Sequence, residues 1–330
     1  AAVGAALATV GLAVTAVGFA IPPVGLAVTA VGFAVPPVGL TLTAVGFAVP
    51  PVGLAGRRPT DPELATVRPR LIVTDLDGTL LDASGAVSAL NRAALQRAHD
   101  QGVPVVVATG RPSRWLGVLE GLPGIHPEVV VSNGAGLFHL HLRRHTVVHG
   151  LDASLALEVA DDLRAAIPGL GFAFEWGEHF GCEPSVRQSE GEWLVVAPLA
   201  ELAQRDEPVL KLLGFHDEHG SDALAERGRE VIGERLTLTH SHMGEYGLLE
   251  ISAAGVTKAS ALADVCNRLG VEPADVVAFG DMPNDLPMLT WAGRGYAVAQ
   301  GHPMLRQAGL ATTDGPQPEA VGRMIEALLA

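Results

Sequence analysis

Two carboxylates two residues apart, Asp75 and Asp77, directly follow an apolar run at residues 71–74, and Gly78 comes next. Such a run predicts a buried parallel strand, and open α/β sheets place their chemistry just beyond the ends of these strands. An Asx turn explains Asp77 and Gly78. It does not explain Asp75, because an unpaired charge at a buried strand end is costly. The pair therefore favours a site for a cation or for phosphate chemistry.

Two further predicted strands end in polar residues that suit the same chemistry. Residues 103–108 end in Thr109 and Gly110, a hydroxyl and a backbone N–H that can bind phosphate oxygens. Taken alone, this segment also fits a plain strand-to-helix turn with Thr109 as the N-cap. Residues 276–279 end in a turn that holds Asp281, Asn284 and Asp285. Their side chains offer the hard oxygen ligands that Mg²⁺ prefers.

A lysine opens the helix that we predict to run to residue 269. Lys258 is one of two lysines in the sequence, the other being Lys211, although lysine and arginine together number 22. Composition alone therefore makes a lysine at this point unexpected. A solvated helix residue is the alternative interpretation. We expect Lys258 to join the three strand ends in one site.

These four segments, in this order, resemble motifs I to IV of the haloacid dehalogenase superfamily of phosphohydrolases. They look most like its Cof-like subclass, which carries a type IIB cap. The resemblance covers residues 69–330, and its most specific parts are DLDGTLL from Asp75 and FGDMPNDLPML from Phe279. The chain departs from the subclass at Ala259, where glycine is common, and at residues 299–302, where AQGH replaces a Gly-Asn-Ala turn. These departures bear on the fit of the substrate rather than on catalysis.

The spacing of the motifs indicates where a cap is inserted. Asp75 and Thr109 are 34 positions apart, which is too few for a cap domain, whereas Thr109 and Lys258 are 149 apart. The resemblance thus implies an α/β fold, a Rossmann-like parallel sheet core with an inserted α+β cap domain. We expect the hydrolase core at residues 69–150 and 248–330, and the cap at residues 151–247. This arrangement argues against the mutase-like members, whose cap lies between the first two motifs.

The predicted cap alternates helices with strands. Helices are expected at residues 152–166, 199–205 and 221–233, and strands at residues 171–176, 193–196, 209–215 and 235–240. Several polar or aromatic residues on the loops between cap strands are candidates for contact with a substrate, with a surface position as the alternative for each. They are Glu175, Trp176, Glu178, His179 and Arg187.

The resemblance implies a Mg²⁺-dependent phosphatase that acts on a small phosphate monoester, such as a sugar phosphate or a phosphorylated cofactor. Asp75 would be the nucleophile that forms an aspartyl-phosphate, and Asp77 would act as general acid and base. The ion would be held by Asp75, the backbone carbonyl of Asp77 and Asp281, with Asp285 holding waters or the metal. The phosphate would be bound by Thr109, Gly110, Lys258 and Asn284.

Residues 1–56 are a different kind of polymer, a 14-residue repeat of Gly, Pro, Val and Ala with Pro-Pro pairs beginning at Pro22, Pro36 and Pro50. The stretches between these pairs are shorter than the roughly 20 residues of a membrane-spanning helix. The segment lacks the basic n-region of a secretory signal, so a secretory signal is not supported. A membrane-lying or self-associating segment is one interpretation. The near-identity of the repeats favours the other, tandem-repeat DNA read in frame ahead of the true start. Residues 57–68 are expected to be a linker.

The composition limits the classes of protein and of binding partner that fit this chain. The 330 residues are 48% hydrophobic and carry a formal net charge of −14, enough for a core and two domains. The acidic balance, without a basic stripe, argues against nucleic acid as a partner. Cys182 and Cys266 lack the spacing of metal ligands, which favours a reducing cytoplasm, and a disulfide between them is the alternative.

Two other classes of function stay open. One is a phosphotransferase or mutase of the same fold, in which the phosphoryl group passes to an acceptor other than water. The other is a membrane-associated or scaffolding protein in which residues 1–56 carry the role. The complete set of acidic residues argues against an inactive core.

Overall fold

The structure is a computed structural model, and it describes residues 67–186, 191, 193–244, 246–315 and 317–330. The predictions for residues 1–56, for nearly all of the linker and for Arg187 lie outside the described residues. Within the described part of the chain, none of the helices combines the length and the apolar character that crossing a bilayer requires.

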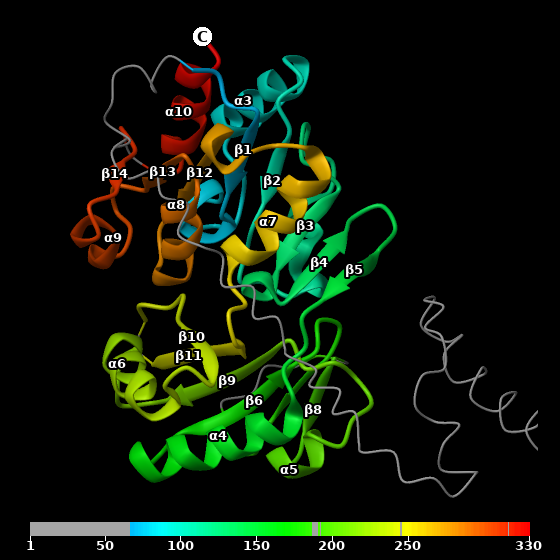
Figure 1. The fold of residues 1–330 in the computed structure, drawn as a ribbon, viewed down its shortest axis with the longest axis vertical. Helices are drawn as coiled ribbons and strands as arrows, with labels where there is room; N and C mark the ends of the chain where they lie inside the picture. The colour runs from blue at the N-terminus through cyan, green and yellow to red at the C-terminus, as the bar shows by residue number, and fades with distance from the viewer. Residues whose placement is uncertain (1–66, 187–190, 192, 245, 316) are drawn as a thin grey trace, which may run out of the picture. The chain divides into compact units, whose positions relative to one another are not determined.

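A five-stranded parallel sheet forms the centre of the core, with strand order β14-β13-β12-β1-β2 (Figure 1). The adjacent strands β1 (Leu71–Thr74) and β12 (Val276–Gly280) pair in parallel. On the other side of β1 lies β2 (Val105–Val107), and beyond β12 lie β13 (Arg294–Ala297) and β14 (Ala311–Thr312). Because β2, β1 and β12 are parallel neighbours, the polar residues that follow them meet at one edge of the sheet.

Helices cover both faces of this sheet, which explains why its central strands consist mostly of apolar residues. Ile72 packs toward α3 (Ala89–Asp100) and α10 (Ala320–Leu328), whereas Leu71 and Val73 pack toward α7 (Lys258–Leu269) and α8 (Leu286–Trp291). All three side chains are completely buried. The predicted Rossmann-like core is confirmed.

A smaller antiparallel sheet continues the core beyond β2. It consists of β3 (Glu128–Val131), β4 (Gly136–His139) and β5 (Arg144–Val148), in that order. A single parallel bridge between Ala108 and Val130 connects it to the end of β2. The turn between β3 and β4 therefore lies next to the residues that follow β2.

The inserted segment forms a six-stranded sheet with order β10-β11-β9-β6-β7-β8. All neighbours are antiparallel except β7 and β8. On one face, α4 (Ala153–Ala166) and α6 (Ser221–Ile232) share an apolar cluster with Phe172, Phe174 and Leu249, and α5 (Leu199–Leu202) joins it (Figure 1). The strands are β6 (Gly171–Glu175), β7 (Phe180–Cys182), β8 (Leu194–Val196), β9 (Lys211–His216), β10 (Leu236–Thr239) and β11 (Gly247–Ala253).

The C-terminal boundary predicted for the cap differs from the observed pairing. β11 pairs with β9 and β10, so the cap sheet continues to Ala253 rather than ending at residue 247. Leu249 and Ile251 fall in the stretch that was assigned to the core from the sequence, but they pack under α4 and α6. We keep the division into core and cap as a proposal, with its second boundary moved to follow Ala253.

Candidate active site

Asp75 follows β1 and begins a tight turn. Its backbone N–H donates to the carbonyl of Phe279 (3.0 Å), which extends the pairing of β1 with β12 by one residue. Immediately after Asp77, the chain passes through Gly78 with φ = 76°, a conformation that favours glycine. A Cβ atom at Gly78 would also lie 2.3 Å from Oδ2 of Asp281. Glycine at this position therefore permits both the turn and the close approach of Asp281.

Three carboxylates and one ammonium group converge at this edge of the sheet. Oδ1 of Asp75 lies 2.5 Å from Nζ of Lys258, and Oδ1 of Asp285 lies 2.7 Å from the same atom. One oxygen each of Asp75, Asp281 and Asp285 lie within 4.8 Å of one another. The four side chains are buried, Lys258 and Asp285 completely. Since one ammonium group cannot balance three carboxylates, the cluster has an excess of negative charge.

Burial shifts the protonation of this cluster. Burial raises the pKa of Asp75 well above its usual value, and the charges of Asp285 and Asp281 act in the same direction against Lys258. Burial and the neighbouring Asp285 raise the pKa of Asp281 to about 7. Burial lowers the pKa of Lys258, but the carboxylates of Asp285 and Asp75 outweigh it and the net pKa rises. The cluster therefore favours either bound protons or an added cation.

Asp285 organises the turn after β12. Its Oδ2 accepts hydrogen bonds from the backbone N–H groups of Asp281 (2.9 Å) and Met282 (3.0 Å), while Oδ1 accepts from Lys258. The hydroxyl of Thr79 donates to Oδ1 of Asp281 (2.9 Å). These bonds fix the direction of the Asp281 side chain and leave its Oδ2 facing Gly78.

The residues predicted to bind phosphate lie beside Asp75 with different surroundings. Thr109 is completely buried, and its hydroxyl accepts from the N–H of Arg111 (3.0 Å). Gly110 and Asn284 line the same pocket as Asp75. Nδ2 of Asn284 donates to Oδ1 of Asn133 (3.0 Å), and its Oδ1 has no hydrogen-bond partner among the described residues. Nδ2 of Asn284 carries a second N–H donor, and the side chain of Asn133 also interacts with the Glu250 carboxylate, whose pKa it helps to lower.

The carboxylate of Asp77 is bound by Arg111 rather than by Lys258. Its two carboxylate oxygens accept from Nε and Nη2 of Arg111, at 2.7 and 2.6 Å, and its side chain is 57% exposed. Only its backbone was predicted to bind a metal, so this geometry is compatible with that prediction. To reach a leaving group, the Asp77 carboxylate has to exchange at least one of these bonds. The hydrogen bonds from Arg111 are a feature that the sequence did not indicate.

A pocket of about 700 Å³ lies between this edge of the core and the free face of the cap sheet. The alternation of side chains along the cap strands determines which residues line the cap side of the pocket, because Phe172, Leu212 and Leu249 point toward the cap helices. Their neighbours Lys211, Leu213 and Glu250 therefore line the pocket instead.

The cap residues predicted from the sequence are only partly in the pocket. Glu175 lines it and forms a buried ion pair with Arg114, whose Nη1 lies 2.5 Å from Oε1. Trp176 instead packs in the apolar cluster under the cap helices, because it begins the turn after β6 on the opposite face. Neither Glu178 nor His179 lines the pocket, since Glu178 accepts from Ser113 and His179 pairs with Glu207. Arg114, Lys211 and Glu250 were missed, and the rarity of lysine was the one signal that pointed to Lys211.

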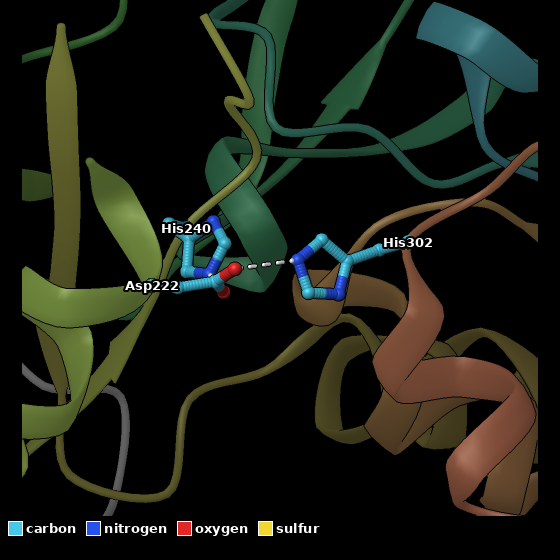
Figure 2. Close-up of side chains that lie close together, drawn as sticks. All are labelled: Asp222, His240 and His302. Atoms are coloured by element: carbon cyan, nitrogen blue, oxygen red, sulfur yellow. Dashed lines mark hydrogen bonds and ion pairs between the residues drawn. The ribbon is translucent and has the colours of Figure 1, made fainter.

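A second cluster of titratable residues lies where cap and core meet, and Figure 2 shows its three side chains. Asp222 of α6 accepts from Nε2 of His240 (3.0 Å) and from Nε2 of His302 (3.1 Å). His302 begins α9 (Pro303–Gln307), and its Nδ1 accepts from the N–H of Met304 (3.2 Å), so Nε2 carries the proton. A metal-binding histidine instead donates through its second nitrogen. These donors therefore form a hydrogen-bonded bridge rather than a metal site.

The bridge touches the acidic cluster through the backbone. The N–H of His302 donates to the carbonyl of Asp281 (2.7 Å), and Gly301 completes the turn by donating to Val298 (2.8 Å). A Cβ atom at Gly301 would lie 2.8 Å from that same Asp281 carbonyl. Residues 299–302, which depart from the subclass pattern, thus connect α6 of the cap with a residue of the candidate active site.

Comparison with known proteins identifies the family to which the chain is similar. Residues 72–325 match the model of the haloacid dehalogenase-like hydrolase family. A 5-amino-6-(5-phospho-D-ribitylamino)uracil phosphatase of Bacillus subtilis is 28% identical over 278 residues, covering 78% of this chain and 97% of that protein. A phosphoglycolate phosphatase of Natronomonas pharaonis is 30% identical over 244 residues, covering 74% and 90%. Both matches extend over most of the relative's length.

Solved structures show the same fold. A phosphatase of the haloalkanoate superfamily from Bacteroides thetaiotaomicron has a TM-score of 0.65 and 22% identity, and the match covers 83% of this chain and 98% of that one. A sugar phosphatase of subclass IIB has a TM-score of 0.64 and 17% identity, and the match covers 78% of this chain and 97% of that one. The resemblance seen in the sequence, including the inserted cap, is therefore confirmed at the level of the fold.

Proposed function

Because the chain belongs to the haloacid dehalogenase-like hydrolase family, we propose that it hydrolyses a small phosphate monoester through an aspartyl-phosphate on Asp75. One observation carries the proposal. The carboxylate of Asp75 stands at the end of a buried strand, lines a large pocket and is held by Lys258 at 2.5 Å. A buried carboxylate that faces a pocket beside a fixed ammonium group is suited to attack phosphorus.

The donor set fits Mg²⁺. Asp75, Asp281 and Asp285 each bring a carboxylate oxygen to one small volume, and hard oxygen ligands are those that Mg²⁺ prefers. We propose that Asp75 and Asp281 bind the ion directly together with the backbone carbonyl of Asp77. Asp285, whose two oxygens already accept hydrogen bonds, would contribute through water. When bound, the ion would neutralise the excess charge and polarise the phosphoryl group.

The chain's own residues carry out the transfer of the phosphoryl group and its hydrolysis. Asp75 attacks phosphorus and the bond to the leaving oxygen breaks. Asp77 protonates that oxygen, and then deprotonates the water that attacks phosphorus and releases Asp75. Lys258, the N–H of Gly110, Thr109 and the amide of Asn284 hold the three equatorial oxygens, whose negative charge must be stabilised in the transition state.

Arg111 prepares Asp77 for this role. Its guanidinium group holds the Asp77 carboxylate at the mouth of the pocket, and Asp77 and Arg111 both line that pocket. We propose that a bound phosphate dianion draws Arg111 toward itself, because Arg forms strong bidentate contacts with phosphate. The Asp77 carboxylate is then released, takes up from solvent the proton that it will donate, and faces the leaving oxygen.

The names of the relatives support a phosphorylated metabolite as the substrate. Among them are phosphatases of a ribityl-uracil phosphate, of phosphoglycolate and of HMP-PP. We propose that the cap residues facing the pocket choose among such compounds. The two cysteines are both free and buried, which supports a reducing cytoplasm as the site of the reaction.

The proposal is tested by assaying the protein with Mg²⁺ against a panel of phosphate monoesters and measuring released phosphate. We expect turnover of at least one sugar, polyol or cofactor phosphate, and its loss in Asp75→Asn. The exposed Asp161→Asn serves as the control, since Asp161 pairs with no described residue except Arg164 on the same cap helix. Equal activity in Asp75→Asn and the parent protein would overturn the proposal.

A further inference from the structure

A buried ion pair lines the side of the pocket that the cap sheet forms. Nζ of Lys211 on β9 lies 2.7 Å from Oε1 of Glu250 on β11, and the two side chains are 5% and 3% exposed. Nζ also donates to the carbonyl of Gly110 (2.9 Å), beside the proposed phosphate site. The pair therefore belongs to the cap but lies directly at the residues that follow β2.

Each partner retains unused hydrogen-bonding capacity. Oε2 of Glu250 is buried and has no hydrogen-bond partner of good geometry among the described residues, although the side chains of Ser241 and Asn133 lie near enough to this carboxylate to help lower its pKa. Lys211 has three N–H donors, and its described partners, Gly110 and Glu250, occupy two of them. A buried carboxylate oxygen without a donor is costly, about 1–3 kcal/mol or more for a charged group. A partner from outside the chain would remove this cost.

The carboxylate is ionised and so acts as an acceptor. Burial raises the pKa of Glu250, but the ammonium group of Lys211, together with the side chains of Ser241 and Asn133, outweighs it, and the net pKa lies below the usual value. An ionised carboxylate cannot donate, so Oε2 requires a hydroxyl or N–H from its partner. The neighbouring Lys211 requires an acceptor. A hydroxyl group meets both needs with one atom, because it donates through hydrogen and accepts through oxygen.

We propose that Lys211 and Glu250 select phosphate monoesters whose leaving group carries a hydroxyl group, as in polyol and sugar phosphates. This inference rests on the proposed phosphatase function and concerns the same pocket. The hydroxyl donates to Oε2 of Glu250 and accepts from Nζ of Lys211, while the phosphate lies at Asp75. Both residues are specificity determinants that hold the leaving group and take no part in the transfer of the phosphoryl group.

The cap-sheet residues around this ion pair divide the pocket into a polar and an apolar part. In the sheet register, Glu250 opposes Leu213, and Phe215 opposes Leu248. All four line the pocket, so the sheet changes from polar near Gly110 to apolar farther along its strands. Polar contacts are therefore available to the part of the leaving group that is attached to the phosphate.

The test compares erythritol 4-phosphate with butyl phosphate, which have the same four-carbon chain and differ in their hydroxyl groups. With Mg²⁺, we expect kcat/KM of the parent protein to be at least about 30-fold higher for erythritol 4-phosphate, because a site built around a hydroxyl discriminates strongly against its absence. A ratio near one would overturn the inference, and this comparison needs no variant.

A double variant, Lys211→Met with Glu250→Leu, removes both groups without leaving one charge buried alone. We expect the ratio of kcat/KM values to fall at least tenfold. The single variant Glu250→Gln, which keeps an oxygen for Lys211 but loses the second acceptor, should lower the ratio in the same direction. The matched control is Arg227→Met with Glu230→Leu, an exposed ion pair on α6 with the same N···O contact type. Its ratio should remain that of the parent.

The outcomes separate this inference from the proposed function. Unchanged ratios in both Glu250 variants would overturn the role of the pair, while hydrolysis itself would still support a phosphatase. If the parent protein hydrolyses neither compound, nor any other phosphate monoester, the phosphatase proposal fails and the inference falls with it. Thermal unfolding of each variant confirms that the compared proteins are folded.

Discussion

Nζ of Lys258 lies 2.5 Å from Oδ1 of Asp75, although 183 positions separate the two residues in the chain. The contact forms because β1 is central in the sheet and α7 covers the face that contains Leu71 and Val73. Thr257 caps α7 through the N–H of Ser260, so the first residue of the helix is directed at the end of β1. The candidate site therefore depends on the position of one helix start.

Replacing Lys258 with methionine tests this contact. Lys258→Met keeps the length of the side chain but leaves three buried carboxylates without their internal cation. We expect kcat to fall at least about 100-fold, as for the loss of a group that stabilises developing charge. The free energy of unfolding should fall by about 3–5 kcal/mol without metal, as when one partner of a buried pair is removed.

The control for this variant lies on the same helix. Arg268 is 42% exposed and pairs with Glu128. Arg268→Met should change stability by less than about 1 kcal/mol, the range of surface pairs, and leave kcat unaffected. Steady-state kinetics and urea unfolding measure both effects. Similar behaviour of the two variants would mean that Lys258 has no special role.

Gly78 provides a test of the geometry around Asp281. In Gly78→Ala the new Cβ atom would lie 2.3 Å from Oδ2 of Asp281, so this proposed metal ligand must move. We expect the affinity for Mg²⁺ and kcat/KM each to fall at least about tenfold. Gly85 has φ = 78°, close to the 76° of Gly78, and nothing lies within 4 Å of its Cβ position.

Gly85→Ala is therefore a control for backbone strain alone. It should lose stability by about 1 kcal/mol or slightly more, as alanine does where φ is positive, and bind Mg²⁺ normally. Calorimetric titration with Mg²⁺ compares the two variants. If both bind the ion equally well, the contact between Gly78 and Asp281 does not shape the site.

The raised pKa of Asp281, about 7, predicts a pH dependence. An acid whose pKa is higher when folded binds more protons in the folded state, so the metal-free protein should lose stability as the pH rises from about 4 to 7. Above pH 7 this loss levels off. Because Mg²⁺ must displace the proton, its affinity should be about tenfold weaker at pH 6 than at pH 8.

Titrations of the metal-free protein at the two pH values measure this difference. Equal affinities would show that Asp281 either lies outside the metal site or is already ionised at pH 6. Activity should disappear with a chelator and return with Mg²⁺. It should not return with Ca²⁺, which takes more ligands at longer distances and loosens the alignment needed for attack.

The core of this site was predictable because it lies at strand ends. Asp75, Asp281 and Asp285 follow apolar runs that could only be buried parallel strands, and parallel neighbours bring their ends to one edge. The place of Asn133 beside the site was not predicted from the sequence. Asn133 adopts φ = 58° in the turn after β3, and its amide bonds with Asn284, a partner 151 positions away. Nothing in the local pattern identifies such a partner.

The cap was harder to predict for a different reason. Lys211 and Glu250 alternate with apolar residues on β9 and β11, and a period of two does not tell which face meets the core. The position of α4 and α6 decides this, because the apolar set packs beneath them. The contacts of Asp77 with Arg111 depend on side-chain directions in two loops, which residue types alone do not determine.

The interpretation of residues 1–56 as dispensable for catalysis remains a prediction from the sequence. Every residue of the candidate site follows Val67, whose carbonyl accepts from Nη2 of Arg294 (2.7 Å). A chain that begins at Val67 should therefore remain folded and hydrolyse small phosphate esters at a rate within about twofold of the full chain. A tenfold loss, equivalent to about 1.4 kcal/mol of transition-state stabilisation, would contradict this independence.

The central claim is that the phosphoryl group passes through Asp75. We would mix Asp77→Asn with ³²P-labelled p-nitrophenyl phosphate and Mg²⁺, quench with acid and identify the labelled peptide. The leaving group is acidic and needs little protonation, so the variant should form the phosphoenzyme more readily than it breaks it down. We predict one rapid equivalent of nitrophenolate with the label on Asp75. Release of nitrophenolate and phosphate at the same steady rate, without label on Asp75, would contradict the account.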